Sequence, residues 1–300
     1  MYKIKHNQDN NIIEVEHSNT KLYAKLFNNY GGTLQELSLK GHVIIENLAP
    51  LTYDLTYASS ILFPFANRIK DGAYKYKGEK HQFETNLKEE NNALHGLVFN
   101  KPFQVIEKST SETSATVVLE YNETGISIGF PYTYNIQLKY VFTKNTVSLT
   151  VTAKNTSQKT FPFTLGWHPY FLSDNLYDSV ICFDSTKKIL MENRNITDGF
   201  KDIDPITDFY VKDQKLDDCW VLDSDEIKFK TPKYELIMTS SAENNFLQLY
   251  TPPKANNIAI EPTTGVSDSF NNKIGLQTLK PNESYEITWD LTIQDSLIND

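Results

Sequence analysis

The sequence predicts an all-β protein that forms one large antiparallel β-sandwich with few short helices. In several segments apolar and polar residues alternate, as they do in half-buried antiparallel strands. Apolar spacing of the helical kind is not sustained over any window of about 11 to 18 residues. The polar stretches between these segments are rich in Asn, Gly, Asp and Ser, and no glycine-rich nucleotide-binding pattern occurs. Because large sandwiches often reach this length as one core, we expect a single domain over residues 1–300.

The expected strands follow from this period of two. Apolar residues occupy every second position in 136–142, in 147–153 and again in 285–293. Pro281-Asn282 is a turn signal that precedes the last of these segments. We therefore expect all three segments to be strands, with the C-terminal one closing a sheet.

Two stretches rich in Asn and Asp, 193–208 and 253–257, interrupt the strand-like sequence. Both are short, so we interpret them as loops rather than as linkers between domains. No internal repeat divides the chain either.

Composition limits the classes of function. The net charge of −9 repels nucleic-acid phosphates and anionic membranes, so we expect neither partner. No apolar run approaches the roughly 20 residues of a membrane span, and the first residues lack the apolar segment of a signal peptide. Cys182 and Cys219 are too few for a disulfide framework. We expect a soluble, cytoplasmic protein, monomer or homodimer, that binds a small molecule.

One candidate for ligand binding is Arg68, which is one of only two arginines in the chain. It ends an apolar segment, in Phe63-Pro64-Phe65-Ala66-Asn67-Arg68-Ile69. A guanidinium can donate two hydrogen bonds to neighbouring hydroxyl groups and stays charged at any working pH. The alternative is that Arg68 ties down a loop by bonding backbone carbonyls.

Two histidines lie among residues that suit a binding site. His95 precedes a glycine that permits close approach of the backbone, and His168 lies in Gly166-Trp167-His168-Pro169-Tyr170-Phe171. Imidazole titrates near neutral pH and so can act as a general acid. The rings of Trp167, Tyr170 and Phe171 offer flat apolar faces for a ligand. The alternative for each histidine is a structural role in the core.

Glu261 is the candidate base. It follows the apolar run Ile258-Ala259-Ile260 and precedes Pro262, so we expect it at the end of a strand, where the sheet fixes the side chain and a loop gives access. Partial burial beside aromatic rings would raise its pKa toward neutrality. Asp217-Asp218 is a further acidic pair that could accept hydrogen bonds from hydroxyl groups, and simple solvation is the alternative for both sites.

Several short motifs occur in a fixed order over nearly the whole chain. They are Gly31-Gly32-Thr33-Leu34, Asn67-Arg68-Ile69 with Gly72, Tyr74 and Gly78, Asn92-Ala93-Leu94-His95-Gly96, Gly129-Phe130-Pro131, His168-Pro169-Tyr170-Phe171, Leu216-Asp217, Gln248-Leu249-Tyr250 and Glu261-Pro262. Together they resemble the aldose 1-epimerase family, also called galactose mutarotases. The resemblance implies the galactose mutarotase-like fold, a large β-sandwich with an open cleft across one sheet.

The resemblance also implies an activity and a set of site residues. The activity is the interconversion of the α and β anomers of a free aldose such as glucose or galactose, without metal or cofactor. Glu261 would be the general base and His168 the general acid. The residues expected to hold the sugar are Arg68, His95, Asp217, Asn67, Trp167 and Gln248.

Other functions stay open on the sequence. A hexose-6-phosphate epimerase has the same fold but carries additional arginines, and this chain follows His95-Gly96 with Leu97-Val98-Phe99-Asn100 and holds only Arg68 and Arg194. Lysines could replace the missing arginines as point charges. Asp217 and Glu261 could also be the paired carboxylates of a glycosidase.

Two further alternatives differ in chemistry. His95, His168 and Glu261 have the residue types of a two-histidine, one-carboxylate metal site. A carbohydrate-binding protein without turnover would keep the sugar-binding residues but not need the base.

Overall fold

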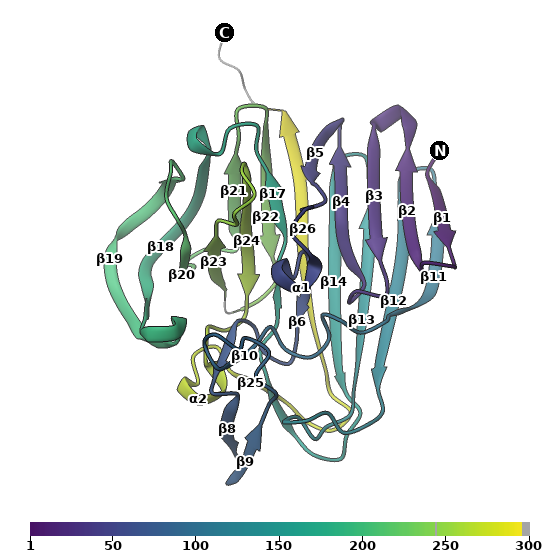
Figure 1. The fold of residues 1–300 in the computed structure, drawn as a ribbon. Helices are drawn as coiled ribbons and strands as arrows, with labels where there is room; N and C mark the ends of the chain where they lie inside the picture. Colours follow the sequence, from purple (N-terminus) through teal and green to yellow (C-terminus); the bar gives the residue numbers. More distant parts are fainter. Residues whose placement is uncertain (244, 296–300) are drawn as a thin grey trace.

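Two layers of β-sheet lie face to face in the computed structural model, which describes residues 1–243 and 245–295 (Figure 1). One layer is a five-stranded antiparallel sheet in which each strand pairs with the next along the chain. Its strands are β1 (Lys3–Asn7), β2 (Ile12–His17), β3 (Leu22–Phe27), β4 (Thr33–Leu39) and β5 (His42–Ile45).

The second layer belongs to a fifteen-stranded sheet in the order β11-β12-β13-β14-β26-β22-β21-β18-β20-β23-β24-β16-β6. Two strands lie off this path, because β17 pairs with β24 and β19 pairs with β18. The bounds are β6 (Ile61–Leu62), β11 (Gln104–Thr110), β12 (Ala115–Glu123), β13 (Tyr134–Phe142), β14 (Thr146–Asn155), β16 (Gly166–Trp167), β17 (Tyr170–Leu172), β18 (Val180–Met191), β19 (Thr197–Tyr210), β20 (Asp217–Val221), β21 (Glu226–Lys230), β22 (Tyr234–Ser240), β23 (Phe246–Tyr250), β24 (Asn257–Thr263) and β26 (Ser284–Asp295).

Short elements lie between these strands along the chain. Three two-stranded ladders are β7 (Arg68–Lys70) with β10 (Asn92–Leu94), β8 (Ala73–Tyr76) with β9 (Glu79–Gln82), and β15 (Phe161–Phe163) with β25 (Gln277–Leu279). The helices are α1 (Tyr53–Thr56), α2 (Ser269–Asn272) and the 3-10 turns η1 (Ser18–Thr20), η2 (Leu176–Asp178) and η3 (Asn193–Asn195). The expectation of few, short helices is therefore confirmed.

The core lies between the two layers, where the alternating residues point. Ile136 and Leu138 of β13 are buried, and so are Val151 of β14 and Trp289 of β26, while the residues between them face outward. They join residues of the five-stranded sheet in one hydrophobic cluster that extends from Tyr2 to Ile293. Each buried aliphatic or aromatic side chain contributes roughly 1.5–3 kcal/mol relative to exposure, so this cluster holds the layers together. The three strands predicted from alternation are confirmed, but the C-terminal one, β26, lies inside the large sheet between β14 and β22 and does not close it.

Residues 193–208 are a correction to the sequence prediction. They do not form a loop but run through η3 into β19, which is 14 residues long. In Figure 1 β18 and β19 form a long hairpin, the β18–β19 arm, that curves away from the body of the sheet. Most side chains of β19 are exposed, so this edge strand needs no apolar alternation and tolerates Pro205. The other polar stretch ends where Asn257 begins β24.

The arrangement brings four parts of the chain to one place. They are the β7–β10 ladder, α1, the break between β16 and β17, and the region of the large sheet that β20, β23 and β24 form; in Figure 1, β10 lies below the lower ends of β23 and β24. In the described residues, no helix has the length and apolar character needed to cross a membrane.

Candidate active site

A cavity of about 190 Å³ lies where these elements meet. Its volume is below the roughly 300–1,000 Å³ of pockets for drug-sized ligands, so it suits a smaller molecule. The lining residues are Leu55, Thr56, Tyr57, Asn67, Arg68, Leu87, Leu94, His95, His168, Tyr170, Asp217, Gln248, Tyr250 and Glu261. Seven of the eight site residues predicted from the sequence are among them, and Trp167 is the eighth.

The floor of the cavity comes from three adjacent strands. Gln248 of β23 lies directly opposite Glu261 of β24, so both side chains project from the same face of the sheet. Asp217 of β20 is opposite Tyr250 of β23. Tyr250 and Gln248 are two positions apart on that strand, so Asp217 projects from the same face of the sheet as Gln248. Nε2 of Gln248 donates a hydrogen bond of 2.7 Å to Oδ1 of Asp217. The sheet therefore fixes both carboxylates before any ligand binds.

Glu261 lies inside β24 and not at its end. The strand continues through Pro262 to Thr263, and Pro262 pairs with Leu247. A proline is tolerated here because the neighbouring strand is interrupted between β16 and β17, while the amides of Ile260 and Thr264 donate to the carbonyls of Pro169 and Leu165. The sequence prediction placed the strand end two residues too early, and the side chain is more rigidly held as a result.

The opposite wall is the β7–β10 ladder, in which Leu94 pairs with Arg68. Asn67 and His95 both have left-handed backbones, with φ of 60°, and the amide of His95 donates to the carbonyl of Asn67 at 2.9 Å. Such conformations are costly for residues other than glycine and concentrate at functional sites. Gly96 allows this wall to approach the core, because a Cβ there would lie 2.2 Å from the carbonyl oxygen of Phe63.

His168 lies between β16 and β17, and hydrogen bonds of its backbone amide and carbonyl hold it in place. Its amide donates to the carbonyl of Ser60 at 3.0 Å, and its carbonyl accepts from the amide of Ser59 at 2.8 Å. The ring is buried, with Nε2 3.4 Å from Oε1 of Glu261. It also meets the ring of His95 edge-on, with the centroids 4.9 Å apart. The proposed acid and base are thus neighbours in the floor of the cavity.

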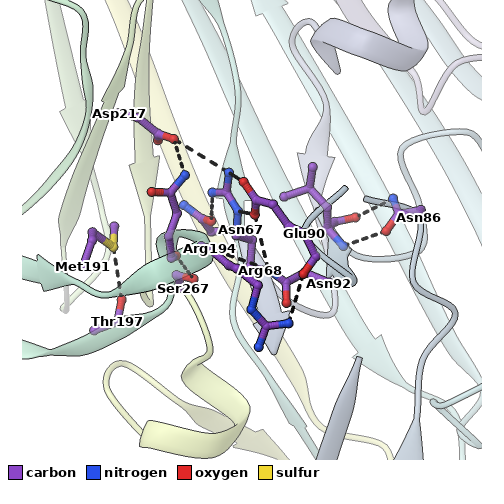
Figure 2. A network of polar contacts seen from close by, with 12 residues as sticks. Asn67, Arg68, Asn86, Glu90, Asn92, Met191, Arg194, Thr197, Asp217 and Ser267 are labelled. Atoms are coloured by element: carbon purple, nitrogen blue, oxygen red, sulfur yellow. Dashed lines mark hydrogen bonds and ion pairs between the residues drawn. The ribbon is translucent and has the colours of Figure 1, made fainter. Parts of the chain in front are cut away.

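Arg68 is held by an acidic residue that the sequence analysis did not identify. Its Nε and Nη2 donate to the two carboxylate oxygens of Glu90 at 2.7 and 3.3 Å, and its Nη1 donates to Oδ1 of Asn67 at 3.0 Å. Nη2 also lies 3.7 Å from Oδ2 of Asp217 (Figure 2). Two carboxylates thus surround one guanidinium, so the positive charge of Arg68 is already compensated.

Burial shifts the two central groups in opposite directions. Desolvation raises the pKa of Glu261 well above the usual range, and the charge of Asp217 raises it further while Arg68 lowers it. Desolvation also lowers the pKa of His168 to about 4. The effect on His95 has the same direction, because burial and then the charges of His168 and Arg68 lower its pKa. The pKa of Asp217 is raised by burial, against the attraction of Arg68.

Trp167 corrects one expectation from the sequence. Its ring is fully buried and stacks on that of Trp289 in the core, with the centroids 6.1 Å apart. Phe171 is likewise buried in the core, while Tyr170 lines the cavity. Residues adjacent in an extended chain point to opposite sides, so one run of aromatics cannot present all its faces to one ligand.

The cavity also contains residues that the sequence analysis missed. Tyr57 contacts the ring of His95, with the centroids 4.8 Å apart, and its hydroxyl accepts a hydrogen bond from Asn86. Glu90 stands in the polar run Lys88-Glu89-Glu90-Asn91-Asn92, which has the composition of a surface turn. Neither residue has a sequence signal beyond its nearness to a motif, because the contact partner lies far along the chain.

A metal site is not formed by the candidate residues. Within the part of the chain that the structure describes, no group of three or more His, Cys, Asp or Glu side chains could hold a metal ion. His95, His168 and Glu261 therefore do not have the arrangement of a two-histidine, one-carboxylate centre.

Comparisons with known proteins identify the family and the fold. The family model for aldose 1-epimerase matches residues 14–292. The Escherichia coli (strain K12) protein YihR is 21% identical over an alignment of 279 residues, which covers 87% of this chain and 87% of that protein.

Solved structures of similar fold cover almost the whole chain. A galactose mutarotase-like protein from Clostridium acetobutylicum has a TM-score of 0.85 and 20% identity, with 98% of each chain covered. The galactose 1-epimerase from Lactobacillus acidophilus has a TM-score of 0.80 and 19% identity, also with 98% of each chain covered. The fold is thus that of the galactose mutarotase-like proteins, and because the family model spans nearly the full length, this chain belongs to the aldose 1-epimerase family.

Proposed function

We propose that this protein is an aldose 1-epimerase that interconverts the α and β anomers of a free, uncharged aldose of the glucose or galactose kind. The observation that carries the proposal is the contact of His168 with Glu261, 3.4 Å apart in the floor of a small cavity. One of these groups is a base and the other an acid, and their pKa values are shifted in opposite directions by burial. Such pairs are typical of acid and base catalysis.

The pair holds one proton that the reaction can use. Burial favours the uncharged form, in which the proton lies on Glu261 and the imidazole of His168 is neutral. Transfer of this proton to His168 gives a carboxylate and an imidazolium without changing the number of protons in the site. A bound sugar would stabilise that form, because it offers a donor to Glu261 and an acceptor to His168.

Ring opening then follows from general acid and base catalysis. Glu261 accepts the proton of the anomeric hydroxyl, while His168 donates its proton to the ring oxygen. The bond between C1 and the ring oxygen breaks, and C1 becomes the carbon of an aldehyde. Rotation about C1–C2 exposes the other face of this carbonyl.

Reclosure uses the same residues in reverse. His168 takes the proton of the attacking hydroxyl, and Glu261 returns a proton to the aldehyde oxygen as the bond to C1 forms. The site ends with the one proton with which it began. His95 and Arg68 would stabilise the partial negative charge that develops on oxygen in both directions. No redox change occurs, so the reaction needs no cofactor.

The charges that line the cavity support an uncharged substrate. Among the lining residues that the structure describes, Arg68 is the one arginine, and Glu90 and Asp217 already compensate its charge. No lysine lines the cavity in the described residues. A phosphate group would add negative charge beside Asp217 and Glu261 without a partner, which costs several kcal/mol when the charge is buried. This argues against a hexose 6-phosphate.

The test is mutarotation across a panel of free and phosphorylated aldoses, followed by polarimetry with the spontaneous rates subtracted. We expect acceleration for free aldoses and little for their 6-phosphates. Acceleration confined to the 6-phosphates would mean that the substrate is a phosphorylated aldose and not a free one. Release of reducing sugar from glycosides would instead indicate the glycosidase chemistry of Asp217 and Glu261, and sugar binding without any rate enhancement would indicate a binding protein.

A further inference from the structure

The tip of the β18–β19 arm reaches the candidate site from outside the cavity. Asn195, the last residue of η3, donates a hydrogen bond of 3.0 Å from Nδ2 to Oδ2 of Asp217. The other oxygen, Oδ1, accepts from Gln248 in the floor of the cavity. Asn195 does not line the cavity itself. The carboxylate of Asp217 is therefore held from two sides, once by the floor and once by the arm.

The turn at the tip is strained. Arg194 and Asn195 are consecutive residues in the left-handed region, with φ of 63° and 54°. Asparagine tolerates this conformation but it is unfavourable for Arg194, and a chain keeps such a residue there only where its surroundings impose it. A free hairpin tip would relax, so the tip must be fixed by contacts with the body of the protein.

Four contacts fix it. Nη1 of Arg194 donates to Oδ1 of Asp71 at 2.8 Å and to the carbonyl of Glu90 at 3.0 Å. Asn92 donates to the carbonyl of Arg194 at 3.2 Å. The hydroxyl of Ser267 donates to the carbonyl of Asn195 at 2.8 Å. Figure 2 shows Arg194 close to Glu90 and Asn92, and the docked tip thus touches residues next to β7, which holds Arg68, and in or next to β10, which His95 follows.

We propose that Asn195 is a positioning residue for Asp217, and that the β18–β19 arm is in this way part of the active site. The inference rests on the proposed function, because it assigns Asp217 the role of holding a sugar hydroxyl. Oδ2, the oxygen that Asn195 holds, also lies 3.7 Å from Nη2 of Arg68, and Oδ1 accepts from Gln248, so the hydrogen bond from Asn195 holds the rotamer in which Asp217 lies between the floor and Arg68. The side-chain amide of Asn195 donates this hydrogen bond without adding charge, whereas a lysine or arginine at the same place would add a positive charge.

The direct test is Asn195→Gly, because glycine adopts a φ of 54° without strain and so removes the amide while keeping the turn. We expect the KM for the free aldose to rise about tenfold, the size of a lost hydrogen bond to a charged group, with kcat changed less than about threefold. Asn195→Asp keeps the shape but replaces the donor by a carboxylate, and we expect it to raise KM further. Asn193→Gly is the matched control, since Asn193 is exposed in the same turn.

A double-mutant cycle separates positioning from a merely structural role. If Asn195 acts through Asp217, Asn195→Gly should change KM little in an Asp217→Asn background. An unchanged KM in Asn195→Gly, or an equal loss in both backgrounds, would overturn the inference. Calorimetric titration of the same aldose gives the binding constant independently of turnover. If the wild-type protein neither binds nor epimerises any aldose, the proposed function fails first, and that outcome is distinct from a silent Asn195 in an active enzyme.

Discussion

At the scale of single residues, the chemistry depends on one proton shared by His168 and Glu261. A sheet position fixes Glu261, and backbone hydrogen bonds on both sides fix His168. Burial makes the carboxyl a stronger base and the imidazolium a stronger acid than they are in water. The reaction needs both properties at once, and it gets them from desolvation.

The pH dependence of kcat/KM should report this shared proton. Below about pH 4, the lowered pKa of His168, the pair takes up a second proton and Glu261 can no longer accept one. Above the raised pKa of Glu261 the pair loses its only proton and His168 has none to donate. We expect a plateau between these limits in rates measured by polarimetry after subtraction of the buffer rate. An acid limb near pH 6.5, the value of a free imidazole, would contradict the desolvated pair.

Glu90 should affect sugar binding through Arg68. Glu90→Gln keeps the side-chain length but removes the charge and one of the two oxygens that hold the guanidinium. We expect KM for the free aldose to rise about tenfold, because Arg68 is then drawn to Asp217, 3.7 Å away. Glu89→Gln is the matched control, since Glu89 is exposed beside it. Equal KM values for the two variants would mean that Glu90 does not position Arg68.

Sequence motifs located most residues of the cavity but not their supports. Asn67, Arg68 and His95 come from two short motifs that pair as β7 and β10, so local sequence carries them together. The partners Glu90 and Asn195 lie in polar turns, and only the folded chain brings them to Arg68 and Asp217. The prediction that Trp167 holds the sugar is wrong for a different reason. β16 is two residues long, and the composition of so short a strand does not show which face of the sheet each side chain takes.

At the scale of elements, the alternation of apolar and polar residues predicted strands correctly where one face of the strand is buried. β13, β14 and β26 alternate because they cover the core, and their pairing follows. β19 does not alternate, since most of its side chains are exposed, so the sequence of 197–210 resembles a loop. The alternation of apolar and polar residues therefore does not predict the β18–β19 arm, although the tip of the arm contacts the site.

The close approach of the β7–β10 wall to the core should depend on Gly96. In Gly96→Ala the new Cβ would lie 2.2 Å from the carbonyl oxygen of Phe63, at a φ of +77°. We expect a loss of about 3 kcal/mol or more in the free energy of unfolding, measured by urea denaturation. Gly78→Ala is the control, because its φ of +86° is equally unfavourable but no atom lies within 4 Å. We expect that variant to lose only about 1–2 kcal/mol. Similar losses in both would show that the close approach is not the constraint.

At the scale of the whole molecule, the two-layered core accommodates buried ionisable groups at a cost in stability. His168 has a lower pKa in the folded chain than in the unfolded one, so the unfolded chain binds more protons between about pH 6.5 and 4. The contribution of His168 to folding is thus full above pH 6.5 and is lost as the pH falls. The raised pKa of Glu261 acts in the opposite sense, because its folded form keeps a proton that the unfolded form loses above its ordinary pKa.

Removing His168 should expose this cost. Relative to the wild type, His168→Gln should gain up to about 3 kcal/mol in the free energy of unfolding as the pH falls from 7 to 4. Urea titrations at several pH values measure the difference. His6→Gln in the edge strand β1 serves as the control. A constant difference between His168→Gln and the wild type over this range would mean that the imidazole is not kept neutral by the fold.

The most direct test of the whole account is the anomerisation rate of Glu261→Gln on freshly dissolved α-galactose or α-glucose. The amide keeps the size of the side chain and its place opposite Gln248, but it cannot accept the anomeric proton. We expect the variant to bind the sugar with an affinity within about threefold of the wild type. We also expect it to lose at least about 100-fold in rate, the usual contribution of a general base. A variant that epimerises as fast as the wild type would contradict the central role of Glu261.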